Sequence, residues 1–243
     1  MAAIIPARLT ARHALAAAID ERGRNSEAQQ MYCEVLADQQ RVLGHDHPDT
    51  LATRHQLARV IGHLRYEQAE QLHREVLADR QRVLGEEHPD TLASGHAVAR
   101  AIGRQGRGQE AGRMFLHVLT GRRKILGDDH PDTLATRHAL AWSITWQGRY
   151  EEAEQQYRCV LADQFRLLPG EHPHVLVTRH DLAWSIAKQG RNSEAEQQYR
   201  RVLADQLRVL GEDHPRPFTP GFILRPRSQH REGTPKPNTS TGS

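Results

Sequence analysis

Histidine is the residue type in this chain whose spacing suggests chemistry. The sequence contains 16 histidines, and ten of them occupy two positions that recur along the chain. We call the first set the histidine ladder: His13, His55, His96, His138 and His180. Zn²⁺ needs imidazole nitrogens at about 2.0–2.1 Å, whereas equivalent side chains on successive packed helices lie about 8–10 Å apart. A metal site is therefore not expected. We favour hydrogen bonding of each ladder histidine to the next repeat of the sequence pattern, and ligand contact is the alternative.

The second set of histidines directly precedes proline. It consists of His47, His88, His130, His172 and His214. A residue before proline is biased towards extended backbone, and proline is well tolerated in the first turn of a helix. We therefore interpret these dipeptides as linkers that start helices.

Signatures of catalysis are absent from the sequence. GxxxxGK[ST], GxGxxG, GxSxG and HExxH do not occur, although these patterns mark common phosphate, dinucleotide, nucleophile and zinc sites. The carboxylates are spread over repeated positions rather than clustered. We expect no enzyme activity, no cofactor and no bound metal.

The spacing of His-Pro reveals a repeated unit. The dipeptide recurs at intervals of 41, 42, 42 and 42 residues, and LATRHQLA at 51–58 returns as LATRHALA at 134–141. A period of this length is typical of solenoids, in which each unit stacks on its neighbours. The likeness between units extends from about residue 6 to residue 215.

The fourth repeat shows how one unit folds. Apolar residues from Leu134 to Ile144 share one face of a first helix that starts at Pro131. Gly148 suits the left-handed residue that ends a helix, and a second amphipathic helix follows from about Tyr150. The same register predicts five helix pairs, which begin near Pro6, Pro48, Pro89, Pro131 and Pro173. The third pair is rich in glycine, which costs about 1 kcal/mol relative to alanine inside a helix, so we expect softness or a bend there.

These residues resemble a known family. Leu140-Ala141, the turn Gly148-Arg149-Tyr150, then Ala153-Glu154 and Tyr157 resemble tetratricopeptide repeats (TPR), and the Leu-Gly-x-x-His-Pro-Asp linker is similar to that of the kinesin-light-chain type found in actinobacterial proteins. The resemblance implies an all-α, right-handed α-solenoid of five antiparallel helix pairs that acts as a protein- or peptide-binding scaffold. The alternative it implies is a sensory or regulatory module of a nucleotide-binding signalling ATPase system.

An arginine replaces the bulky apolar residue usual at one first-helix position of this family. It occurs as Arg12, Arg54, Arg137 and Arg179, and an aspartate near the end of the second helix recurs as Asp38, Asp79, Asp163 and Asp205. The third repeat has lost both and carries Gly95 and Gly121. Because the two residues disappear together, we predict an arginine–aspartate bridge within each of the other hairpins.

The resemblance also implies that the first helices line a concave groove. One turn after the ladder, the same helix face carries a residue that differs between repeats: Ala17, Arg59, Arg100, Trp142 and Trp184. Positions that contact a ligand are free to vary, and arginine and tryptophan are enriched in binding hot spots. We therefore take Arg59, Arg100, Trp142, Trp146 and Trp184, together with His55, His96, His138 and His180, as the candidate groove. Gln56, Arg104, Asp181 and Lys188 would form its rim.

The implied partner is a protein or peptide, acidic and with an apolar anchor. The alternative for the tryptophans is packing between repeats, and the residues do not decide between the two. Nucleic acid is not expected, because 33 Lys and Arg alternate with 30 Asp and Glu to give a net charge of only +3. No apolar run of about 20 residues is present to span a membrane. Cys33 and Cys159 are not equivalent in the repeat, which suits a reducing cytoplasm.

The ends of the array differ from its middle. We expect a repeat array over residues 1–215 and a disordered, basic, Pro/Ser/Thr-rich tail over residues 216–243. Solenoids usually carry polar capping helices, and neither end shows one. Either the uncapped ends self-associate with other chains, or the chain is a piece of a longer array; we favour the second.

Overall fold

Ten α-helices make up the described part of the chain. The computed structural model describes residues 4–63 and 65–210, so the predicted tail and His214 lie outside the described residues. The helices form five antiparallel hairpins, as the repeat predicts: α1 (Ile4–Glu21) with α2 (Asn25–Val42), α3 (Pro48–Ile61) with α4 (Tyr66–Leu84), α5 (Pro89–Arg104) with α6 (Gly108–Leu126), α7 (Pro131–Trp146) with α8 (Tyr150–Leu167), and α9 (Pro173–Lys188) with α10 (Asn192–Leu210).

The four described His-Pro linkers each start the first helix of a hairpin, which confirms their predicted role. Proline occupies the first turn, and the preceding histidine is the N-cap. Its Nδ1 accepts a hydrogen bond from the backbone N–H two residues later, at 3.1 Å between His130 and Asp132 and at 3.2 Å between His172 and His174. In the turn between the two helices of a hairpin, a glycine adopts a positive φ angle at Gly106, Gly148 and Gly190. Glycine accepts this conformation without steric cost.

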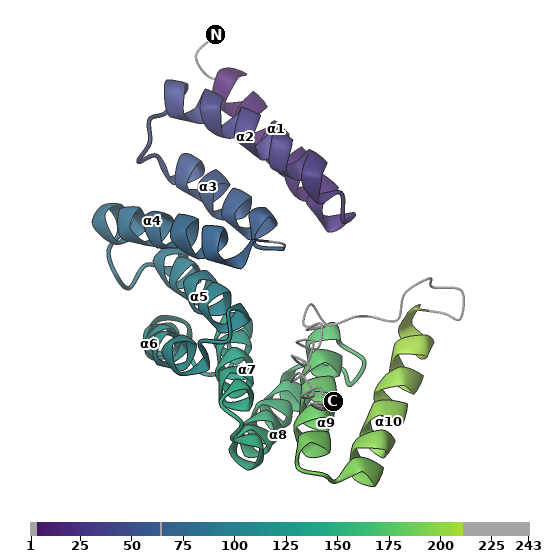
Figure 1. Ribbon diagram of the computed structural model, residues 1–243. Helices are drawn as coiled ribbons and strands as arrows, with labels where there is room; N and C mark the ends of the chain where they lie inside the picture. The colour runs from purple at the N-terminus through teal and green to yellow at the C-terminus, as the bar shows by residue number, and fades with distance from the viewer. Residues whose placement is uncertain (1–3, 64, 211–243) are drawn as a thin grey trace, which may run out of the picture.

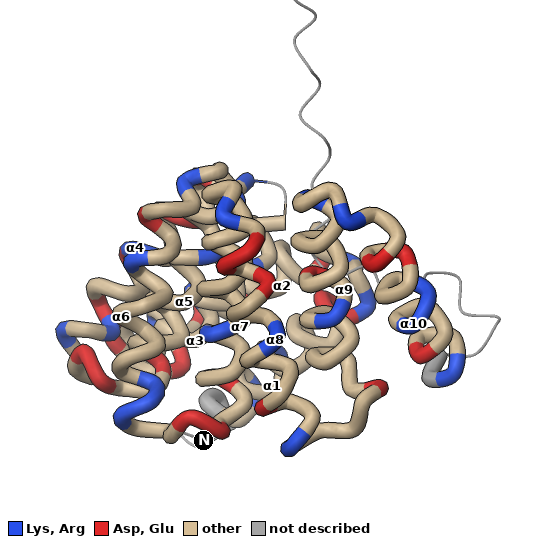
Figure 2. The backbone as a smooth tube through the Cα atoms, turned by 90° about the horizontal axis from the view of Figure 1, so that it is seen from below, with Lys and Arg blue, Asp and Glu red and all other residues tan. Residues whose placement is uncertain are grey.

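Each helix packs on the next along the chain, and the ten helices bend into an open arc (Figure 1). Helices α3, α5 and α7 lie towards the inside of the arc, with α4 and α6 on its outside. The core is a ribbon two helices thick; Val98, Phe115, Tyr157 and Leu182 belong to one continuous cluster from α5 to α10. Positive and negative residues alternate along the helices (Figure 2). None of the described helices is long and apolar enough to cross a membrane.

The predicted arginine–aspartate bridges are confirmed in four hairpins. Arg12 contacts Asp38 at 2.6 Å, and the pairs Arg54–Asp79, Arg137–Asp163 and Arg179–Asp205 each measure 2.5 Å. Exchange of a bulky apolar residue for arginine is tolerated because the second helix supplies a carboxylate beside it. Solvent screens pairs with this degree of exposure, so each adds little to stability.

The glycines of the third repeat allow close packing of helices. A Cβ atom on Gly103 would lie 2.3 Å from Cζ3 of Trp142, and one on Gly121 would lie 2.7 Å from Cδ2 of Leu92. Both α5 and α6 continue through these residues without interruption. The glycines that suggested softness therefore mark places where a neighbouring side chain occupies the space of a missing Cβ.

Gly103→Ala is expected to destabilise the protein by about 1–2 kcal/mol, because displacement of the Trp142 ring outweighs the gain in helix propensity. Urea unfolding followed by circular dichroism gives the free energy, and tryptophan emission reports the displaced ring. Gly112→Ala is the matched control. Its Cβ would lie 3.1 Å from the Ser143 hydroxyl, a milder crowding than the 2.3 Å contact at Gly103. The gain in helix propensity offsets this crowding, so the variant should stay within about 0.5 kcal/mol of wild type. Equal stability of Gly103→Ala and wild type would contradict the packing described above.

Candidate functional site

The histidine ladder pairs each first helix with an aromatic residue on the second helix of the same hairpin. Ring centroids lie 5.4 Å apart for His13–Tyr32 and 5.2 Å for His96–Phe115. The other pairs are His55–His73, His138–Tyr157 and His180–Tyr199, at 5.1, 5.4 and 5.3 Å. We did not identify this set of second-helix aromatic residues from the sequence, although the repeat register contains the signal. Residues 32, 73, 115, 157 and 199 are equivalent in the repeat, and all have ring side chains.

Four of the ladder histidines hydrogen-bond to the following repeat, which confirms the favoured interpretation. His13 Nδ1 lies 2.8 Å from Thr53 Oγ1, and His138 Nε2 lies 3.0 Å from Asp181 Oδ2. The bonds of His55 to Ser94 and of His96 to Thr136 are longer, at 3.5 and 3.4 Å. His180 contacts Asp181 of its own repeat at 3.1 Å. The ladder therefore joins neighbouring repeats, and part of it also lines the pockets described next.

A cationic pocket lies between α3 and α5. Four arginines from two successive repeats line it, and the ladder residues His55 and His96 lie beside them. The arginines are Arg59, Arg100, Arg104 and Arg122. No carboxylate is among its described lining residues. Arg59 forms an ion pair with Asp20, and the guanidinium group of Arg104 lies 5.4 Å above the ring of Tyr66.

Burial and neighbouring positive charge lower the pKa values of basic groups in the cationic pocket. Burial, followed by repulsion from Arg104 and Arg59, lowers the pKa of Arg100 to about 10. Burial and neighbouring positive groups also lower the pKa of His55 to about 3 and that of His73 to about 4. Burial is the main cause of each of these shifts, and the neighbouring positive groups add to it.

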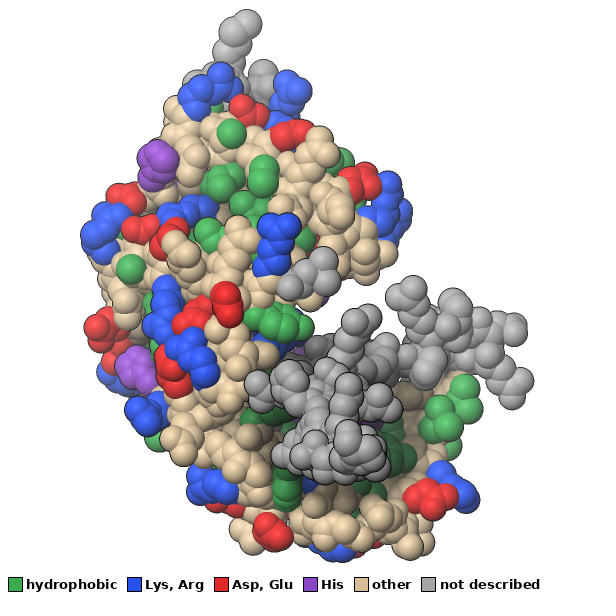
Figure 3. Space-filling view, viewed as in Figure 1, with side chains coloured by type: hydrophobic (Ala, Val, Ile, Leu, Met, Phe, Trp, Pro, Cys, Tyr) green, Lys and Arg blue, Asp and Glu red, His purple; other side chains and the backbone are tan. Residues whose placement is uncertain are grey.

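A second pocket adjoins the first, and we call it the aromatic pocket. It lies between α5, α7 and α9 and is lined by His96, Arg100, His138, Trp142 and Gln164, with His174 and Thr178 from α9. Because Arg100 and His96 line both pockets, the two are continuous along the first helices. Figure 3 shows the molecule hollowed on the inner side of the arc, where these helices lie.

The three tryptophans form one aromatic cluster between α7 and α9. Trp142 is only 5% exposed, and its ring centroid lies 5.7 Å from that of Trp146. Trp146 stacks on Trp184 at 6.3 Å, and Lys188 Nζ lies 5.1 Å from the Trp184 ring. The tryptophans therefore pack between repeats, and of the three only Trp142 is among the lining residues of the aromatic pocket.

One residue expected at the rim lies elsewhere. Asp181 is buried and accepts hydrogen bonds from His138 and His180, which together help to hold its pKa below the usual range against the effect of burial. Its helix position was predicted correctly, but the adjacent repeat covers it. Arg104, also expected at the rim, lines the cationic pocket.

Comparison with known proteins identifies the repeats. Two tetratricopeptide repeat models match the chain, one at residues 8–49 and 50–90 and the other at residues 95–164 and 143–208. No curated protein sequence matches.

Solved structures share the fold. The kinesin-light-chain TPR-like repeats of Podosopora anserina are 34% identical, with a TM-score of 0.67, and the match covers 84% of this chain and 97% of that one. BtubC from P. vanneervenii is 18% identical, with a TM-score of 0.68 and coverage of 92% and 90%. PlcR of Bacillus thuringiensis, solved with the peptide PapR7 and DNA, is 15% identical, with a TM-score of 0.65 and coverage of 84% and 70%. The chain belongs to the tetratricopeptide repeat family, and its repeats are similar to those of kinesin light chains.

Proposed function

We propose that this protein is a scaffold that binds an extended acidic segment of a partner protein or peptide along the inner face of the arc. The observation that carries the proposal is the convergence of Arg59, Arg100 and Arg104 on one pocket without a carboxylate in its described lining. Partial burial weakens the screening of such charges by solvent, so a carboxylate placed there interacts more strongly than on an open surface.

The adjoining aromatic pocket supplies the apolar half of the recognition. Its apolar lining includes Trp142, Ala139 and Val177, which suits an aliphatic or aromatic side chain. Successive first helices lie about 8–10 Å apart, and an extended chain advances about 3.3 Å per residue. The acidic residue and the apolar anchor of the ligand should therefore be about three residues apart. PlcR, which shares the fold, was solved with a peptide bound.

Titration of the protein with synthetic peptides, followed by tryptophan emission, tests this function. A peptide with several glutamates and one leucine three residues from a glutamate should bind and change the emission. Its affinity should fall as salt rises, because the pairs involved are electrostatic. A peptide with lysine in place of glutamate should not bind, and one without the leucine should bind more weakly. Equal binding of the two charge types, or tighter binding of a single-stranded oligonucleotide, would contradict the proposal.

A further inference from the structure

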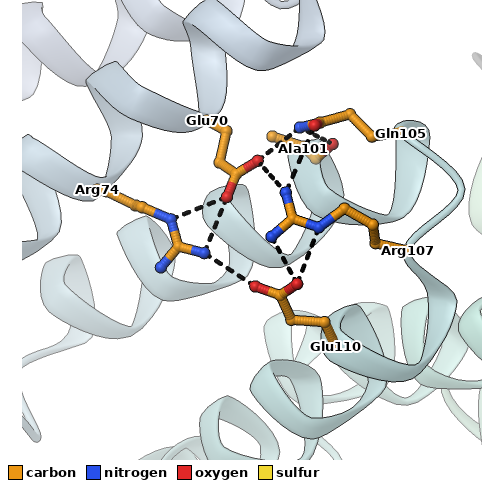
Figure 4. Close-up of polar contacts among 6 residues, drawn as sticks. All are labelled: Glu70, Arg74, Ala101, Gln105, Arg107 and Glu110. Atoms are coloured by element: carbon orange, nitrogen blue, oxygen red, sulfur yellow. Dashed lines mark hydrogen bonds and ion pairs between the residues drawn. The ribbon is translucent and has the colours of Figure 1, made fainter.

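The second and third repeats are joined by a network of four charged residues (Figure 4). Glu70 on α4 accepts from Arg74 on the same helix at 2.8 Å and from Arg107, at the following hairpin turn, at 2.7 Å. Arg107 also contacts Glu110 at 2.5 Å, and Arg74 contacts Glu110 at 3.1 Å. We call this arrangement the clasp. It requires the motif Glu-x-x-x-Arg on the second helix of one hairpin and the motif Arg-x-x-Glu at the start of the second helix of the following hairpin.

The fourth and fifth repeats carry a second clasp. Glu154 contacts Arg158 at 2.6 Å and Arg191 at 2.8 Å, and Arg191 contacts Glu194 at 2.5 Å. At the other two junctions the first half is missing, because Gln29 and Gly112 stand where the clasp has glutamate. The clasp therefore forms wherever both halves of the motif are present.

Each end of the described array carries one unmatched half. On α10, Glu196 and Arg200 form the Glu-x-x-x-Arg pair at 2.5 Å. On α2, Arg24 and Glu27 form the Arg-x-x-Glu pair. Both pairs are exposed, and no described residue of another repeat contacts either. The α10 half has the same residue types and spacing as the Glu70 and Glu154 halves of the two clasps. The half at the start of α2 has those of the Arg107 and Arg191 halves.

Described apolar residues beside these two halves are also exposed. Leu203 on α10 is 48% exposed, whereas its equivalents Leu119 and Leu161 are 3% and 7% exposed. At the opposite end Leu15 on α1 is 52% exposed, whereas its equivalent Leu182 is 7% exposed. These are the surfaces through which inner repeats pack on each other. Three exposed alanines extend the stripe around Leu15 along the same helix face: Ala11, Ala14 and Ala18.

A second series of ion pairs also lacks a partner at the α1–α2 end of the described array. Arg82–Asp46, Arg166–Asp129 and Arg208–Glu171 each join a second helix to the linker before its own hairpin, at 2.5, 2.5 and 2.9 Å. Arg41 is the first member of this series, and it contacts Asp38 of its own helix at 2.9 Å. Among the described residues, no linker carboxylate pairs with Arg41.

From these complementary ends we infer that the protein associates with a second copy of itself, head to tail. The α9–α10 end of one copy packs on the α1–α2 end of the next, and Glu196 and Arg200 complete a clasp with Arg24 and Glu27. Because the two contacting surfaces differ, the interface is heterologous, and it propagates into a filament unless the rotation closes a ring. This surface is separate from the inner face of the arc.

Sedimentation velocity over a range of protein concentrations tests the inference. The wild-type protein should show a mass that rises with concentration and falls with added salt. The variants E196R/R200E and R24E/E27R should each associate about 100-fold more weakly, because like charges then meet. A mixture of the two should associate again, since the unchanged ends of the two variants match each other and so do their swapped ends. This rescue also shows that both variants are folded.

The matched control is R149E/E152R. Arg149 and Glu152 form the same Arg-x-x-Glu pair, but at the junction where Gly112 replaces the glutamate, so association should equal that of wild type. A wild-type protein that stays monomeric up to its solubility limit overturns the inference, as does equal weakening by the control. The inference is also overturned if the variant F218D/F222D associates and the wild-type protein does not. The surface of α10 would then bind the chain's own C-terminal segment in the wild-type protein.

Discussion

Phe115→Ala is expected to lower the free energy of unfolding by about 3–5 kcal/mol, the cost of removing a large ring from a packed core. Phe115 is fully buried on α6 and contacts the ring of His96 edge-on at 5.2 Å. It lies in the middle repeat, within the cluster that runs from α5 to α10. Because the stability of a solenoid is close to a sum over repeats and their interfaces, a cavity there also weakens the coupling of the two halves.

Urea unfolding by circular dichroism measures this loss, and a broader or two-step transition would report the weakened coupling. Leu116→Ala is the control on the same helix, one residue further on. Leu116 is 55% exposed, so its truncation should change the free energy by no more than about 0.5 kcal/mol. If the two variants lose similar stability, the pairing of ladder histidine and second-helix ring does not hold the repeat together.

Mild acid should unfold the protein. The pKa of His55 is lowered to about 3 and that of His73 to about 4, and the pKa of His96 is lowered well below its usual value; burial is the main cause in each. In the unfolded chain these histidines titrate near 6.5. Below that pH the unfolded state binds protons that the folded state excludes, so stability is complete above pH 6.5 and falls as the pH falls towards 4.

The size of this effect follows from proton linkage. Each such histidine removes up to about 1.4 kcal/mol per pH unit, and the three together remove about 4 kcal/mol per unit at most. His73→Phe is the discriminating variant, because the equivalent residue Phe115 is already phenylalanine. It should retain the fold at pH 7 and reduce the pH slope of stability by about a third. A slope unchanged by this variant would show that other groups cause the acid sensitivity.

Much of the fold follows from the sequence because its determinants are local and repeated. Pro131 and its equivalents fix where first helices begin. The joint loss of the arginine and aspartate at Gly95 and Gly121 predicted a contact between residues 25 or 26 positions apart in the other hairpins. Repetition makes such pairs visible in one sequence, since each repeat is an independent sample of the same geometry.

The site was less predictable because it depends on packing between repeats. Trp142 and Trp184 occupy equivalent positions, yet only Trp142 is among the lining residues of the aromatic pocket. The Trp142 ring packs against Gly103 on the neighbouring helix, so its position depends on a residue of another repeat. Arg122 would be expected in solvent, but it is buried, and its Nη1 donates to the Asp132 carbonyl at 2.8 Å and to Thr136 Oγ1 at 2.7 Å. Nothing in the local pattern distinguishes it from the exposed Arg123.

The most direct test of the central claim is a charge swap in the cationic pocket, with the affinity of the glutamate–leucine peptide as the readout. Arg100→Glu/Arg104→Glu should weaken that peptide about 100-fold and allow the lysine peptide to bind. Arg100→Gln/Arg104→Gln should weaken binding of the glutamate–leucine peptide without allowing the lysine peptide to bind. The control is Arg113→Glu/Arg201→Glu, which changes the net charge equally at two exposed positions outside both pockets. Retained specificity in the control and reversed specificity in the pocket variant is the predicted result; equal weakening in both would contradict a binding site on the inner face of the arc.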